Sequence, residues 1–304
     1  MTVAGEDEAA SRPVALFVLG EARSGTSVLA RILARCGGSG EPYVANAVNE
    51  AILRRNGSSG LDPTLRIQDD GAFNAAEKAL CLREIGAFLT GLPVAPLVVI
   101  KDPRISTLSG LWFEAARLSG FDVATVIAVR HPRDVISSVA VRGAPIPEIS
   151  SALWLKFNLL AEAGTRGVPR VFVDYDNLVQ DWRREMGRIS ATLGVSLDVR
   201  DDGAAERLLK PRIALPRDDG SVAELAGAEW ISEVYDPISA AARDQPVDQQ
   251  ALDRAFAAYR ARERGFRPVF DGFQALDKMS KHFRPVMMNM IDKARTTANK
   301  RRAN

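Results

Sequence analysis

The stretch Val14–Cys36, VALFVLGEARSGTSVLARILARC, decides the fold. It begins with an apolar, β-branched run over residues 14–19 and continues through a loop that contains Gly20 and Gly25. An apolar segment with helical periodicity follows, near residues 25–36. The order strand, glycine loop, helix places several backbone N–H groups and a helix N-terminus around one point, which favours binding of an anion. The stretch therefore predicts a buried strand followed by an anion-binding loop.

The rest of the chain repeats the alternation of strand and helix. Further β-branched runs at 97–100, 123–129 and 170–173 predict buried parallel strands. Helical periodicity is found near residues 72–90, 107–119, 133–141, 147–166 and 177–193. This pattern predicts an α/β fold, a P-loop-type central parallel sheet flanked by helices on both faces. The turn-rich segment 37–71 predicts loops and short helices over the carboxyl edge of the sheet, where such folds bind ligands.

Composition and length predict one globular domain with an extension. The chain has 304 residues, of which 46% are hydrophobic and 26% charged, and this excludes disordered, collagen-like and disulfide-scaffold proteins. After residue 200 Pro and Asp accumulate, which predicts a loop-rich region and then a helix near 247–264. We expect a flexible N-terminus over 1–12, one domain over 13–265, and a basic, helical C-terminal extension over 266–304.

The cysteines and the first residues point to a reducing compartment. Cys36 and Cys81 lie outside any motif with metal-ligand spacing, and we expect reduced core thiols. The start MTVAGEDEAASR is acidic, whereas a secretory leader begins with basic residues. The apolar runs are far shorter than the roughly 18 residues that span a bilayer. These features predict a cytoplasmic protein.

The loop departs from the usual nucleotide-triphosphate pattern at one position. Gly20, Gly25 and Ser27 fit the Walker A spacing G-x-x-x-x-G-K-[ST], but Thr26 stands where the lysine is expected. A nucleoside triphosphatase uses that lysine on the β- and γ-phosphates, so its loss argues against triphosphate chemistry. Arg23 is the alternative cation. A tight turn without a ligand is the competing interpretation.

A second motif follows the third predicted strand. Arg130 ends that strand in RHPRDVISS, and Ser138 lies eight residues later on the next predicted helix. A guanidinium and a hydroxyl placed in this way can bind one phosphate from two sides. Arg130 alone would be interpreted as a surface ion-pair residue, but together with the first loop it favours a ligand with two anionic groups.

Three motifs in order resemble one enzyme family. GEARSGTS at 20–27, KDPR at 101–104 and RHPRDVISS at 130–138 are similar to the motifs of sulfotransferases that use 3′-phosphoadenosine 5′-phosphosulfate (PAPS). The resemblance covers residues 14–215. It is strongest to bacterial members and to the carbohydrate and tyrosyl-protein branches, because Arg23 stands where the cytosolic branch has lysine. It implies that the first loop binds the 5′-phosphosulfate, and that Arg130 and Ser138 bind the 3′-phosphate.

The resemblance also implies a set of cofactor-binding residues. Tyr175, in VDYDNL, resembles the tyrosine that lies near the adenine, and the LKPR stretch at 209–212 is similar to a late Lys-Pro element that reaches the cofactor. The full set comprises Arg23, Ser24, Gly25, Thr26, Ser27, Arg130, Ser138, Tyr175, Lys210 and Arg212.

Sulfuryl transfer requires stabilisation of charge on the leaving phosphate and a base for the proton of the acceptor. Arg23 is the expected cation and Lys101 a second one, unless Lys101 is a solvated strand-end lysine. We expect no metal, since no carboxylate cluster for Mg²⁺ is evident.

The base is expected to be a carboxylate. Of the two histidines, His131 lies inside the second motif and His282 in the basic extension. Glu41, in Gly-Glu-Pro, resembles the element that supplies the catalytic glutamate in carbohydrate and tyrosyl-protein sulfotransferases. Glu50 is the alternative, and both are exposed loop carboxylates in the competing interpretation.

The expected function is transfer of a sulfuryl group from PAPS to a hydroxyl of a sugar, glycolipid or secondary metabolite. The alternatives are a P-loop kinase-like phosphotransferase and a non-catalytic nucleotide-binding protein of the same fold. No nucleic-acid partner is expected, and the sequence indicates neither the acceptor nor the oligomeric state.

The C-terminal segment concentrates positive charge. Residues 278–304 contain eight basic residues and one acid, a net charge of +7, which leaves −5 for the rest of a chain whose formal charge is +2. Apolar residues recur there at helical spacing, as in a helix that lies on a membrane surface. The segment predicts peripheral contact with an anionic membrane or a partner enzyme, the alternatives being a docked helix or a frayed end.

Overall fold

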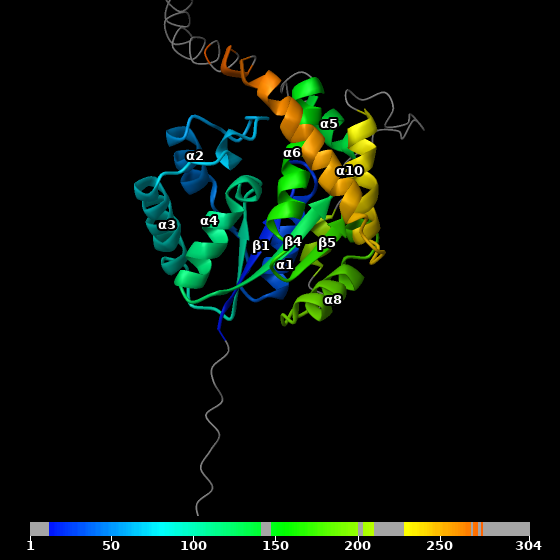
Figure 1. The fold of residues 1–304 in the computed structure, drawn as a ribbon. Coiled ribbons are helices and arrows are strands. Elements are labelled where there is room, and N and C mark those ends of the chain that lie inside the picture. The colour runs from blue at the N-terminus through cyan, green and yellow to red at the C-terminus, as the bar shows by residue number, and fades with distance from the viewer. Residues whose placement is uncertain are drawn as a thin grey trace, which may run out of the picture.

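The fold is built on a five-stranded, all-parallel sheet with strand order β2-β3-β1-β4-β5 (Figure 1). The computed structural model describes residues 12–140, 147–199, 203–209, 228–268, 270–272 and 275. The strands are β1 Val14–Leu19, β2 Tyr43–Val44, β3 Leu97–Lys101, β4 Asp122–Val129 and β5 Arg170–Asp174. All four predicted strands are confirmed, and β2, which has only two residues, was not predicted.

Helices cover both faces of the sheet, as predicted. They are α1 Thr26–Cys36, α2 Asn46–Arg55, α3 Ala75–Thr90, α4 Ile105–Leu118, α5 Pro132–Ala140, α6 Pro147–Gly164, α7 Tyr175–Gln180, α8 Trp182–Leu193, α9 Ala204–Leu208 and α10 Ala228–Ala241. A 3₁₀ turn, η1, spans Arg66–Gln68, and a further helix spans 249–268. The fold class inferred from the sequence is therefore confirmed, although two helix predictions need correction.

The predicted helix over 177–193 is two helices. Asp181 has an extended backbone, with φ −151°, and its carboxylate accepts a hydrogen bond from the backbone N–H of Arg184 at 3.0 Å. This cap ends α7 and starts α8, because an N-cap residue lies outside the helix that it begins. The loop-rich region predicted after residue 200 contains α10, and this helix includes Pro237.

The alternation of side chains along the strands forms two separate cores. On one face Phe17, Val98 and Ile127 pack with apolar residues of α3, α4, α6 and α10. On the other face Val18 and Val126 pack with α1, α8 and α9. Burial of both faces explains why the strands are continuous apolar runs. The two cysteines are free and buried, as predicted.

The parallel arrangement brings the strand ends together at one edge. β1 pairs with β3 on one side and β4 on the other, and β4 pairs with β5. The segments that follow Leu19, Lys101, Val129 and Asp174 therefore leave the sheet at the same edge. The two sequence motifs and Tyr175 lie in these segments.

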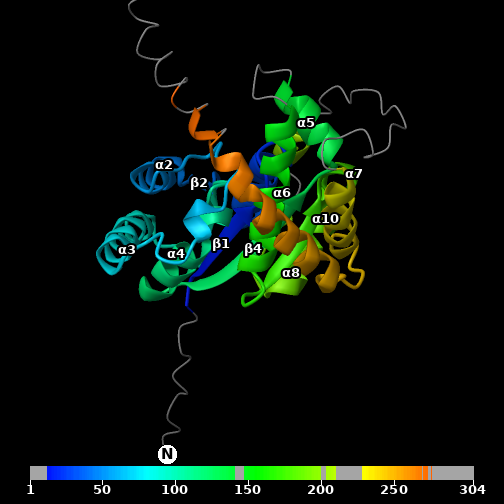
Figure 2. The ribbon, with the colours of Figure 1, turned by 45° about the horizontal axis from the view of Figure 1, so that its top comes forward.

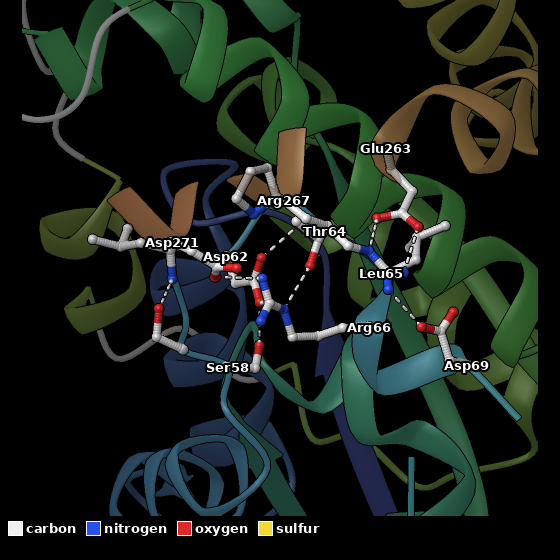
Figure 3. Close-up of polar contacts among 12 residues, drawn as sticks. Ser58, Asp62, Thr64, Leu65, Arg66, Asp69, Glu263, Arg267 and Asp271 are labelled. Atoms are coloured by element: carbon white, nitrogen blue, oxygen red, sulfur yellow. Dashed lines mark hydrogen bonds and ion pairs between the residues drawn. The ribbon is translucent and has the colours of Figure 1, made fainter. Parts of the chain in front are cut away.

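The helix over 249–268 lies across α6, as Figures 1 and 2 show. It also forms hydrogen bonds with the connection that precedes α3. In Figure 3, Glu263 accepts a hydrogen bond from the backbone N–H of Leu65 at 3.0 Å, and Arg267 pairs with Glu263 and with Asp69. Tyr259 donates its hydroxyl to the carbonyl of Pro63. These contacts fix the segment 63–69 against the C-terminal part of the domain.

Within the described ranges, the structure contains no helix with the length and apolar composition needed to cross a membrane. The basic segment 278–304 lies outside the described residues, as do residues 1–11.

Candidate functional site

The loop between β1 and α1 has three residues in the left-handed region of backbone conformation. These are Gly20 at φ 116°, Arg23 at φ 76° and Gly25 at φ 89°. Gly25 is the N-cap of α1 and supplies no side-chain cap, so the first N–H groups of this 11-residue helix have no partner within it. The N–H of Val28 bonds the carbonyl oxygen of Gly25 at 3.0 Å, whereas the N–H groups of Thr26 and Ser27 have no backbone partner among the described residues. Donors at a helix N-terminus are the arrangement that binds anions.

Both glycines are required by close contacts. A Cβ atom at Gly20 would lie 2.5 Å from the carbonyl oxygen of Ala128 on β4. A Cβ atom at Gly25 would lie 2.3 Å from Cδ2 of Tyr175. The loop is therefore packed directly against the neighbouring strand and against the tyrosine that follows β5.

The second motif contacts the first loop. Nη1 of Arg130 donates to the carbonyl oxygen of Arg23 at 3.1 Å, and the Arg130 guanidinium stacks 4.5 Å from the centroid of the Tyr175 ring. Nε of Arg23 donates to the hydroxyl of Ser138 at 2.9 Å. The structure thus brings together Arg23, Gly25, Arg130, Ser138 and Tyr175, which the sequence predicted as one site.

Two hydrogen-bond donors of this site have no hydrogen-bond partner within the described chain. They are the hydroxyl of Ser24, which is 1% exposed, and Nε of Arg130. This Nε forms an ion pair with Asp134, whose Oδ2 lies 3.6 Å away, beyond hydrogen-bond distance. Buried polar atoms are normally satisfied. Unsatisfied donors beside a helix N-terminus fit an anionic ligand.

Lys101 ends β3, the strand next to β1, and pairs in register with Val18. Its side chain is partly buried, and burial lowers the pKa of this lysine, while the charge of Asp102 opposes that shift. The position agrees with the predicted second cation beside the loop.

The two candidate bases each have an ion-pair partner. Glu41 is 67% exposed and pairs with Arg31 of α1 at 3.6 Å. Glu50, on α2, pairs with Arg104, which also contacts the buried Asp102 at 3.2 Å.

The remaining predicted residues are placed only in part. Thr26 is buried in the first turn of α1, and Ser27 is exposed beside it. Lys210 and Arg212 lie outside the described residues. The described residues contain no group of three or more His, Cys, Asp or Glu side chains arranged to hold a metal ion.

Buried charges next to the loop were not singled out from the sequence. Glu21, the second residue of the loop, is 6% exposed, and Lys156 of α6 is 1% exposed. Nζ of Lys156 donates to the carbonyl oxygen of Asp62 at 2.7 Å. The available signal was a single lysine inside the apolar run LWLKFNLL, together with an acidic residue inside an anion loop.

No protein-family model matches the chain, and no curated protein matches it. Among the solved structures that are similar to it are two sulfotransferases. The sulfotransferase domain of the Synechococcus PCC 7002 olefin synthase is 20% identical, with a TM-score of 0.44, over 84% of this chain and 98% of that one. Sulfotransferase STF1 of Mycobacterium tuberculosis H37Rv is 14% identical, with a TM-score of 0.38, over 74% of this chain and 77% of that one. Both are bacterial sulfotransferases, the class that the motifs resemble.

Proposed function

We propose that the chain is a sulfotransferase that moves a sulfuryl group from PAPS to a hydroxyl of a sugar, glycolipid or secondary metabolite. One observation carries the proposal: the anion loop after β1 and the Arg130–Ser138 motif after β4 are joined by direct hydrogen bonds. Two anion-binding elements in contact favour a ligand with two anionic groups. PAPS is such a ligand, because it carries a 5′-phosphosulfate and a 3′-phosphate.

The chemistry of the donor set fits such a ligand. Ser24 and Arg130 supply buried donors without hydrogen-bond partners, and α1 supplies N–H groups at its N-terminus. Hydrogen bonds from charged or oriented donors to anionic oxygens are stronger than hydrogen bonds between neutral groups. Thr26 in place of the P-loop lysine supports a donor other than a nucleoside triphosphate.

In the proposed reaction the bond between sulfur and the leaving phosphate oxygen breaks, a bond between sulfur and the acceptor oxygen forms, and the hydroxyl proton passes to a base. PAPS supplies the activated sulfuryl group. The loop N–H groups and Arg23 stabilise the negative charge that develops on the leaving oxygen, and Lys101 adds a cation from β3. Ser138, which binds Nε of Arg23, orients that guanidinium.

Ligand-dependent stabilisation separates this function from a kinase. We expect 3′-phosphoadenosine 5′-phosphate (PAP), the desulfonated donor, to raise the melting temperature without Mg²⁺. A ligand at 100 times its Kd stabilises a folded protein by about 2.7 kcal/mol. Stabilisation by ATP with Mg²⁺ but not by PAP would instead support a phosphotransferase. Label transfer from sulfur-labelled PAPS to a component of cell extract then identifies the acceptor and distinguishes an enzyme from a binding protein.

The base is assigned by paired substitutions. For Glu41→Gln we expect PAP affinity to be retained and label transfer from PAPS to fall by at least roughly 10²-fold, the lower end for loss of a general base. Glu50→Gln is the matched variant, because Glu50 is the alternative carboxylate. Glu50 forms an ion pair with Arg104. Near-normal transfer in Glu41→Gln with loss in Glu50→Gln would move the role to Glu50.

A further inference from the structure

A buried carboxyl group lies inside the anion loop. Glu21 follows Gly20 directly, and its carbonyl oxygen accepts a hydrogen bond from the N–H of Ser24 at 3.2 Å, which closes the turn. Its side chain is 6% exposed, and Oε2 makes no hydrogen bond within the described chain. Glutamate is rarely buried without a partner, so this atom requires an explanation.

The charges that face Glu21 come from two other elements. The charges of Lys156 on α6 and of Arg104 in the turn after β3 act on it, and the hydroxyl of Tyr259, on the helix over 249–268, lies within the range of its charge. Lys156 also faces the carboxylates of Asp62 and Glu263 and the guanidinium of Arg66. Glu21 therefore shares one buried lysine with two other acids, and this limits the stabilisation of its charged form.

Burial is the dominant influence on both groups. It raises the pKa of Glu21 to about 8, against the opposing effects of the Ala22 N–H and the two cations. Burial also lowers the pKa of Lys156 to about 8. Near neutral pH Glu21 is then a neutral acid, and its carboxyl group is a hydrogen-bond donor.

This protonation state matches the other atoms of the site. The unsatisfied buried atoms of Ser24 and Arg130 are both donors, and α1 adds the donors of its N-terminus. A neutral Glu21 adds one more donor, whereas an ionised Glu21 places a negative charge inside a loop that is built for anions. The neutral form is therefore the one that favours an anionic ligand in the loop.

We propose that Glu21 is a proton-carrying residue of the anion site: the loop binds a phosphate or sulfonate group while Glu21 is a neutral carboxylic acid, and ionisation of Glu21 weakens that binding. The inference rests on the proposed function, because it assumes that the loop binds the anionic part of PAPS or PAP. In this proposal, binding of the anionic group is coupled to protonation of Glu21.

The direction of the pH dependence follows from charge. As pH rises, Glu21 and Lys156 together lose two protons, and their summed charge falls from +1 through 0 to −1 whichever loses its proton first. Each step disfavours an anion. Above the pKa of Glu21, binding must therefore take up a proton, and affinity falls by up to tenfold per pH unit for each proton taken up.

Calorimetry of PAP binding between pH 7.5 and pH 9.5 tests the proposal. The phosphates of PAP are fully ionised in this range, because their second pKa is about 6. For the natural chain we expect affinity to fall with pH, and proton uptake when two buffers of different ionisation enthalpy are compared at pH 9. Glu21→Gln replaces the acid by an amide that donates without titrating. We expect its affinity to fall less steeply from pH 7.5 to pH 9.5 than that of the natural chain, and its binding at pH 9 to take up one proton less, Lys156 accounting for the remainder.

The outcomes separate the two proposals. Glu114→Gln is the matched control, since Glu114 is an exposed acid of α4 paired with Lys78, and it should follow the natural chain. Equal pH slopes in the natural chain and Glu21→Gln would overturn the inference and leave the proposed function standing. Absence of PAP binding at pH 7.5 would overturn both. If Glu21→Gln does not fold, zero proton uptake by the natural chain at pH 9 still overturns the inference.

Discussion

Replacing Arg130 by Ala is expected to weaken PAP binding by about 10³-fold in calorimetry at neutral pH. Removal of one partner of a buried, hydrogen-bonded charge pair costs about 2–5 kcal/mol, and about 4 kcal/mol, in the upper half of this range, corresponds to a factor near 10³. Arg130 has two functions that the substitution removes together. It supplies a buried Nε without a hydrogen-bond partner, and its Nη1 holds the carbonyl of Arg23 at 3.1 Å.

Two further variants separate charge from geometry. Arg130→Lys retains a cation but loses the planar guanidinium that stacks on Tyr175, and we expect an intermediate affinity. Arg117→Ala removes an exposed arginine of α4 and should bind PAP as the natural chain does. Unchanged affinity in Arg130→Ala, with the fold retained in thermal unfolding, would show that Arg130 serves the packing of Tyr175 and not the ligand.

The four main strands could be predicted because burial on both faces leaves a run of β-branched residues between turn-forming residues. β1 was predicted over its full length, and β4 to within one residue. β2 has no such pattern, because Tyr43 and Val44 pair with β3 alone at the sheet edge. Two residues are too few to show the alternation of side chains that marks a strand.

α10 was missed because its sequence contains residues that predict a loop. Pro237 lacks an N–H group and lies inside the helix, where it normally ends helical structure. Ile231, Val234 and Ile238 are nevertheless fully buried in the core beside α6, at helical spacing. Tertiary packing stabilises this helix against its local propensity.

The site was predictable where it depends on topology and unpredictable where it depends on distant packing. Arg23 and Arg130 follow adjacent parallel strands, so the strand order alone brings them together. Glu21 and Lys156 are different, because the acids that share Lys156 come from the connection at residue 62 and from the last helix at residue 263. No local pattern predicts which distant segments surround a buried charge.

Replacing Gly25 by Ala is expected to lower the free energy of unfolding by about 2–6 kcal/mol and to abolish measurable PAP binding. The residue has φ 89°, where an L-residue costs about 1–3 kcal/mol. Its new Cβ atom would also lie 2.3 Å from the Tyr175 ring, and overpacking adds about 1–3 kcal/mol. Relief of the clash must move the loop or the ring, and both carry the predicted ligand contacts.

The two contributions can be measured separately in a double-mutant cycle. In a Tyr175→Ala background the same Gly25→Ala change retains the backbone strain but loses the clash, so its effect on unfolding should be smaller by about 1–3 kcal/mol. Gly187→Ala is the matched control, because Gly187 lies on the exposed side of α8 with nothing within 4 Å of a new Cβ atom. It should raise stability by up to about 1 kcal/mol through helix propensity. If Gly25→Ala instead has the free energy of unfolding and the PAP affinity of the natural chain, the loop conformation does not determine anion binding. The contact between Gly25 and Tyr175 then has no part in the site.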